Sequence, residues 1–150
     1  MGSVSNVTWP QIAIMLAATV VGLVLMTQYA WDLNVMATGV ESAIGLGVNY
    51  KKIRTIAFLL STLMTGVAVS FTGIIGFVGM VAPHVARIIV GNDYRYTIPT
   101  ASVCGALLLM VADSISRVLV TTVSMPIGVV TSLIGGPFFL WLIVRKNQEV

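Results

Sequence analysis

Long apolar runs alternate with short polar joints along the whole chain. The hydrocarbon core of a bilayer is about 30 Å thick, and about 20 residues of apolar helix cross it. Runs of this kind cover residues 12–30, 53–72, 79–90, 98–119 and 127–144. The pattern therefore predicts an all-α, polytopic membrane protein with about five membrane-crossing helices, one of which is short.

The longest uncharged stretch, Thr55 to Ala86, is too long for one straight span. As a helix its 32 residues would measure about 48 Å at about 1.5 Å per residue, against about 30 Å of hydrocarbon. We therefore expect a break inside it, followed by a helix of only about three turns. The remainder of that crossing must be irregular backbone, which is tolerated only where protein or a watery passage surrounds it. The candidate break residues are Gly73, Gly76, Gly79 and Pro83.

The glycines of this stretch allow two other interpretations. A phosphate-binding loop needs a preceding strand and a Lys-Ser/Thr pair, and neither is present around them. Small residues spaced along helices also let two backbones approach closely. We favour helix packing and chain breaking over direct contact with a ligand.

Charge placement decides whether the helix at 79–90 crosses the membrane. If it crosses, seven of the eight Lys and Arg lie inside with the C-terminus; if it lies on the outer surface, only four lie inside. Since cytoplasmic loops are enriched in Lys and Arg, we expect five crossings, an external N-terminus and a cytoplasmic C-terminus. Residues 1–11, with Trp9 and Pro10, then form an interfacial segment on the outer face. The seven residues are Lys51, Lys52, Arg54, Arg87, Arg95, Arg145 and Lys146.

Residues 32–52 are too mixed to span a bilayer. Apolar residues recur there at three- and four-residue steps, which predicts two short amphipathic helices on the cytoplasmic side. Gly39 and the group at 45–47 are the candidate joints.

Composition supports a membrane protein over a soluble enzyme. Hydrophobic residues make up 57% and charged residues 9% of the chain, with a mean hydropathy of +1.00, whereas soluble chains carry roughly 25% charged residues. The net charge of +3 comes from the joints and indicates topology rather than a nucleic-acid partner. The single cysteine, Cys104, lies in an apolar run and is expected to pack there.

Few side chains are candidates for chemistry. His84 lacks a second His, Cys or nearby carboxylate, so we favour a structural histidine over a proton relay and expect no metal site. Asp113 and Arg117 are four residues apart on one helix. The two side chains can be read as an intrahelical ion pair, or Arg117 as an exposed residue that meets an acidic partner. The residues alone favour neither interpretation.

Four motifs together resemble the FecCD-type permeases, which are subunits of ABC importers for iron-siderophores, haem and cobalamin. The likeness covers essentially the whole chain, but matches only the C-terminal half of these ten-helix, type II permeases. The chain is therefore expected to be a fragment or a split gene product. The motifs are LNVMATGVESAIGLGVNYKKIR, IGFVGMVAPHVARIIVGNDYR, LLLMVADSISRVLV and MPIGVVTSLIGGPFFLWLIVRK.

The resemblance implies roles for particular residues. Residues 32–52 correspond to the cytoplasmic segment that couples the permease to its ATPase, although Val40 and Ser42 depart from the usual Glu and Ala. Arg117 corresponds to an Arg that meets a Glu of the substrate-binding protein, and the break corresponds to a region beside the translocation path. The implied coupling residues are Leu33, Gly39, Glu41, Ala43, Leu46 and Gly47.

The resemblance also implies the partners and the activity. These are an ABC ATPase subunit that binds ATP and Mg²⁺, an extracytoplasmic substrate-binding protein, a second permease subunit, and the lipid of the cell membrane. The chain itself is expected to bind no cofactor and to catalyse no reaction. Ferric siderophore is the expected substrate because it is the commonest in the family, with haem or cobalamin as alternatives. Two functions of other classes stay open, an ion-coupled secondary carrier and a non-transporting membrane scaffold.

Overall fold

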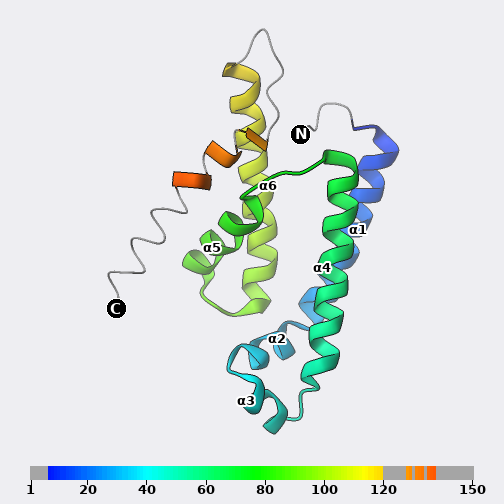
Figure 1. Cartoon of the computed structure of the whole chain (residues 1–150), viewed down its shortest axis with the longest axis vertical. Coiled ribbons are helices and arrows are strands. Elements are labelled where there is room, and N and C mark those ends of the chain that lie inside the picture. Colours follow the sequence, from blue (N-terminus) through cyan, green and yellow to red (C-terminus); the bar gives the residue numbers. More distant parts are fainter. Residues whose placement is uncertain (1–6, 120–127, 130, 134, 138–150) are drawn as a thin grey trace.

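The computed structural model describes residues 7–119, 128–129, 131–133 and 135–137, with only the backbone for 117–119. All of the regular secondary structure in these residues is helical (Figure 1). The helices up to residue 119 are α1 (Trp9–Gln28), α2 (Ala30–Ala37), α3 (Val40–Gly45), α4 (Tyr50–Thr72), α5 (Val78–Val90) and α6 (Tyr94–Leu119).

Three of the helices confirm predicted spans. α1, α4 and the Tyr94–Ser116 part of α6 are long and apolar enough to cross a membrane. The predicted short helix is α5, whose 13 residues extend over about 20 Å. Of the last predicted span, 127–144, the described residues 128–129, 131–133 and 135–137 are helical, and the others lie outside the described part.

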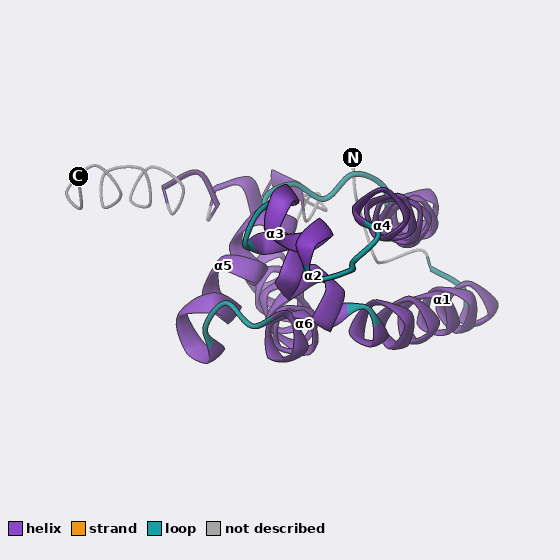
Figure 2. Ribbon diagram, turned by 90° about the horizontal axis from the view of Figure 1, so that it is seen from below, coloured by secondary structure: helices purple, strands orange, loops and turns teal. Residues whose placement is uncertain are grey.

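The helices form two pairs that meet at one end. α1 packs beside α4, and α5 packs against α6 (Figures 1 and 2). α1 and α2 also contact α6 and so join the pairs. α2 and α3 lie together at the end of the molecule where α4 begins, below α5 and α6 and beside the lower part of α4 in Figure 1.

Two helix starts differ from the prediction. α1 begins at Trp9 instead of Ile12, because Pro10 fits a first turn and the Gln11 side chain accepts a hydrogen bond from Thr8 N (2.8 Å). α6 begins at Tyr94 instead of Ile98, so only residues 91–93 separate it from α5. Pro99 therefore lies in the second turn of α6.

Alanines make up most of the buried apolar residues in the described part of the chain, while many large apolar side chains face outward. Ala30, Ala43 and Ala86 have no exposed surface, whereas Phe58 on α4 is 70% exposed. α5 and α6 approach closely at Gly105, where a Cβ would lie 3.6 Å from the Cβ of Ala82. Close backbone packing through small residues is typical of membrane helices, whose outer faces are covered by lipid or by further helices.

Candidate functional site

The predicted coupling segment folds as two short helices with glycine joints. α2 follows α1 after a one-residue interruption at Tyr29, and α3 follows α2 through Gly39. Gly39 has φ 121° and Gly47 has φ 79°, which are conformations that a side chain would strain. Both predicted joints are therefore confirmed, and each has a backbone reason to be glycine.

Most of the residues implied in coupling are exposed at this end of the molecule. Gly39, Glu41, Leu46 and Gly47 are exposed, Leu33 is half-buried, and Ala43 is buried. Ala43 thus holds α3 in place, while its neighbours remain available. The exposed large apolar side chains here are Val40 (48%), Ile44 (63%) and Leu46 (69%).

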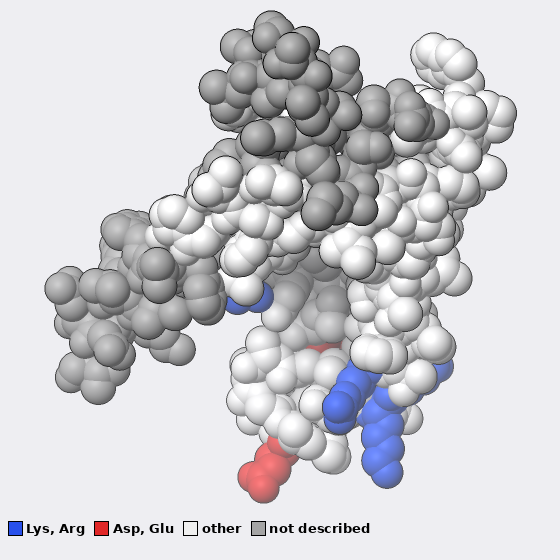
Figure 3. All heavy atoms as spheres, turned by 45° about the horizontal axis from the view of Figure 1, so that its top comes forward, with Lys and Arg blue, Asp and Glu red and all other residues white. Residues whose placement is uncertain are grey.

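Basic residues lie beside these helices, at the start of α4. Lys51, Lys52 and Arg54 are exposed, and the Asn49 side chain caps the helix by accepting a hydrogen bond from Lys52 N (3.1 Å). Positive charge at a helix N-terminus opposes the helix dipole, so helix stability does not explain this cluster. On the face drawn in Figure 3, charged side chains lie toward this end, below the uncharged length of the long helices.

A polar contact that the sequence analysis missed joins α2 to the start of α6. Asn34 Nδ2 donates to Asp93 Oδ1 (2.6 Å), and Asn34 Oδ1 accepts from Tyr94 N (2.9 Å). Asp93 Oδ1 also accepts from Arg95 N (2.9 Å). We call these three hydrogen bonds the Asn34–Asp93 joint. An Asp before a helix is a readable capping signal, but nothing local identifies Asn34 as its partner, 59 residues away.

The joint also sets the charge of Asp93. The hydrogen bond from Arg95 N, the one from Asn34 and the nearby Arg95 charge lower the pKa of this carboxyl below its ordinary 3.8, against a smaller opposing effect of burial. A lowered folded-state pKa means that the carboxylate stabilises the fold above pH 3.8. That stabilisation is lost only as the pH falls through the lower, folded-state pKa.

A second contact reinforces the joint. The Arg95 guanidinium lies over the ring of Trp31, 4.8 Å from its centroid. Trp31 and Asn34 are three residues apart and so share a face of α2. The end of α5 and the start of α6 lie toward the end of the molecule where α4 begins (Figure 1). Arg87, in the last turn of α5, and Arg95, in the first turn of α6, therefore lie toward the same end as Lys51 and its neighbours.

The predicted helix break is present at residues 73–77, which are not helical. Gly73 ends α4 with φ 73°, and its N–H donates to Val69 O (2.8 Å). Phe77, at φ 64°, begins α5 by accepting from Met80 N and Val81 N. Gly76 lies within the break, whereas Gly79 and Pro83 lie inside α5 and do not interrupt it.

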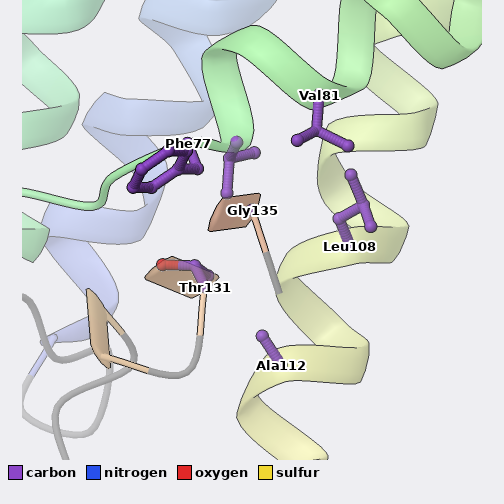
Figure 4. Close-up of a pocket in the computed structure, with 7 residues that line it drawn as sticks. Phe77, Val81, Leu108, Ala112, Thr131 and Gly135 are labelled. Carbon is purple, nitrogen blue, oxygen red and sulfur yellow. The ribbon is translucent and has the colours of Figure 1, made fainter. Parts of the chain in front are cut away.

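The last described residues pack on this break. A Cβ on Gly135 would lie 2.3 Å from the Cβ of Phe77, and one on Gly128 would lie 3.2 Å from Ile74 O. Protein therefore covers one side of the irregular backbone, which is the condition under which such backbone is tolerated inside a membrane. An apolar cavity of about 20 Å³ remains between them (Figure 4), lined by Phe77, Val78, Val81, Leu108, Ala112, Thr131 and Gly135.

An open groove also touches the break. It has a volume of about 660 Å³ and is bordered by α1, α4, the break, α5 and α6. Gly73 and Gly79 line it, together with Asp113 on α6. The groove is largely apolar, and it is much larger than the cavity of about 20 Å³ beside Phe77 and Val78.

The remaining candidate residues are dispersed. Arg117 lies near the far end of α6 from the joint, and its side chain falls outside the described atoms, so its proposed pairing with Asp113 stays a prediction. His84 is half-buried on α5, and Cys104 is a free thiol on α6. Within the described residues no three His, Cys, Asp or Glu side chains gather as a metal site would require.

Comparison with known proteins gives consistent matches. The model of the FecCD transport family matches residues 1–145. The hemin transport system permease protein HmuU of Yersinia pestis is 40% identical over 99% of this chain and 45% of its own length. The cobalamin import system permease protein BtuC of Halobacterium salinarum is 37% identical over 100% of this chain and 40% of its own length. The chain thus spans less than half of these relatives.

A solved structure is similar in fold. It is an inward-facing conformation of a transporter assigned to the metal-chelate ABC type, and it superposes with a TM-score of 0.90 at 28% identity. The superposition covers 97% of this chain and 48% of the other. The arrangement of helices described above is therefore that of about half of such a chain.

Proposed function

Because the chain belongs to the FecCD transport family, we propose that it forms the C-terminal half of a permease subunit in a binding-protein-dependent ABC importer. The observation that carries this proposal is the pair of short helices, α2 and α3, held at the end of three membrane-length helices. Their exposed apolar side chains and Glu41 form a surface suited to a protein partner. That partner is a separate ATPase subunit, which binds and hydrolyses ATP.

The proposed mechanism is alternating access. Closure of the ATPase dimer displaces the coupling segment, and the long helices carry that displacement across the membrane. The break at 73–77 lies beside the translocation path, where Gly73 and Gly76 allow irregular backbone. In this proposal, a second half and a second permease subunit complete the path. The chain's coverage of 45% and 40% of two relatives supports only the first of these.

The proposed substrate is a ferric siderophore, with haem or cobalamin as the alternatives. Relatives of similar identity are named for hemin and for cobalamin, so sequence identity does not separate the chelates. On the outer side, Arg117 is proposed to meet an acidic residue of the substrate-binding protein. Its position near the far end of α6 from the coupling segment is consistent with that role.

Substitution of Glu41 by Arg tests the coupling assignment. Glu41 is exposed on α3, and reversing its charge alters the surface without touching the interior. We expect Glu41→Arg to weaken binding of the ATPase subunit to the assembled transporter by about tenfold, equivalent to about 1.4 kcal/mol. Co-purification of the ATPase subunit and ATP-driven uptake of ferric hydroxamate into proteoliposomes should both fall as a result.

The matched control is Ser42→Ala, which changes an exposed neighbour on the same helix. Gly39→Arg is less informative, because the φ of 121° at Gly39 makes any side chain a backbone perturbation as well. If Glu41→Arg left ATPase binding and uptake unchanged, the coupling assignment would be wrong. Uptake that followed the proton gradient and ignored ATP would instead indicate an ion-coupled carrier.

A further inference from the structure

α2 provides the direct contact between the coupling segment and the α5–α6 pair. Among the described helices, α3 contacts α2 and α4 but neither α5 nor α6. α4 contacts α1, α2 and α3, and likewise does not reach α5 or α6. A displacement of α3 therefore passes to α6 most directly through α2.

The hydrogen bonds between α2 and α6 depend on the orientation of α2. Asn34 uses both ends of its amide, donating to Asp93 Oδ1 and accepting from Tyr94 N. Since the first N–H groups of a helix have no partner within it, Asn34 acts as a cap supplied by another helix. Rotation or sliding of α2 would break hydrogen bonds at the start of α6, and the stacking of Arg95 on Trp31 resists the same motion.

α6 is in turn the partner most extensively packed against α5. Thr97, buried in the first turn of α6, donates to Gly91 O (2.9 Å) and so fixes the turn between them. Gly105 and Ala82 allow close approach further along. We therefore expect α5 and α6 to move as one unit. Because α5 begins directly after the break at 73–77, the break moves with them.

We propose that the Asn34–Asp93 joint is the positioning element through which displacement of the coupling segment moves α6, and with it α5 and the break. The proposal rests on the proposed function, because it requires an ATPase that moves α2 and α3. It assigns to Asn34 and Asp93 a role in coupling ATP hydrolysis to helix movement, and no contact with ATP or substrate.

A reciprocal exchange of the two side chains tests the joint. In Asn34→Asp, the side chain at 34 can no longer donate to Asp93 Oδ1, and two carboxylates face each other, so the contact between residues 34 and 93 opens. In Asp93→Asn, the acceptor oxygen for Arg95 N and Asn34 Nδ2 is retained without charge. In the double variant N34D/D93N, the amide at 93 donates to the carboxylate at 34, which also still accepts from Tyr94 N. The two hydrogen bonds between α2 and the start of α6 are thereby restored, whereas the bond from Arg95 N to Oδ1 of residue 93 is not. Asn34→Ala removes both hydrogen bonds of the Asn34 side chain without adding a charge. It replaces Asn34→Asp in the experiment if the Asp variant assembles poorly.

The readout is movement of α6 in the assembled transporter. Spin labels at Val21→Cys on α1 and Val103→Cys on α6, both exposed positions, are placed in a Cys104→Ser background. Distances between the labels are measured with and without ATP, beside the ATPase rate and co-purification of the ATPase subunit.

We expect the Asn34→Asp transporter to bind the ATPase subunit and to hydrolyse ATP. Its ATP-dependent change in label distance should fall to less than about half of the change in the unsubstituted transporter. The change should recover in N34D/D93N, because two residues that contact each other show coupling in a double-mutant cycle. An undiminished change in Asn34→Asp or Asn34→Ala, or no recovery in the double variant, would overturn the proposal. Failure of the unsubstituted chain to bind an ATPase would instead refute the proposed function, so the two failures are distinct.

Discussion

Where two backbone segments of this chain come close, the size of a single side chain determines whether they can pack. Gly135 is buried, and a Cβ there would lie 2.3 Å from the Cβ of Phe77. Phe77 cannot withdraw easily, because its backbone at φ 64° starts α5 and its carbonyl accepts two hydrogen bonds there. The non-helical residues 73–77 therefore pack against residue 135 so closely that no side chain fits there.

Gly135→Ala is expected to destabilise the protein by about 1–3 kcal/mol, as overpacking of a tight contact does. Gly136→Ala is the matched control, because a Cβ at Gly136 meets nothing within 4 Å, and surface changes of that kind stay within about 0.5 kcal/mol. Thermal unfolding of the detergent-purified transporter compares the two. Equal melting temperatures for both variants would show that the break is not packed in this way.

At the scale of elements, α5 and α6 act as one packed unit. The contact depends on Gly105, beside which Ala82 Cβ and Val78 Cγ1 lie 3.6 and 3.8 Å from a notional Cβ. These are ordinary contact distances, so the interface accepts one methyl group and nothing larger. In a membrane, where lipid is as apolar as the helix faces, such packing is a main source of helix association.

Gly105→Leu is therefore expected to separate α5 from α6 and to lower stability by about 1–3 kcal/mol. Gly105→Ala should change stability by less than about 0.5 kcal/mol, because its Cβ fits the existing space. Unfolding of both variants in detergent, followed by circular dichroism, measures the difference. A Leu variant as stable as the Ala variant would contradict the close approach of the two helices.

For the whole molecule, charge and helix direction agree on an orientation. Lys51, Lys52, Arg54, Arg87 and Arg95 belong to the end that carries α2 and α3. Trp9, 84% exposed, starts α1 at the opposite end. The bias of Lys and Arg toward cytoplasmic loops predicts that the coupling segment faces the cytoplasm.

Cysteine labelling tests this orientation in intact cells. In a Cys104→Ser background, Ser42→Cys should react with a membrane-impermeant maleimide only after the cells are opened, whereas Trp9→Cys should react from outside, since the two exposed sites lie at opposite ends. Labelling of Ser42→Cys in intact cells would reverse the assigned topology.

The sequence by itself determined the all-helical class, the break before a short helix, the two short helices with glycine joints, and the end at which basic residues gather. Apolar length, periodicity, glycine placement and charge can all be read along the chain, because each acts over one or two turns. Only the tertiary structure brought Asn34 to Asp93 and Gly135 to Phe77. It also moved the start of α6 from Ile98 to Tyr94, since a side chain of α2 caps that helix. These contacts join residues roughly 60 positions apart. The packing of the helices determines which residues meet, and no local sequence pattern specifies that packing.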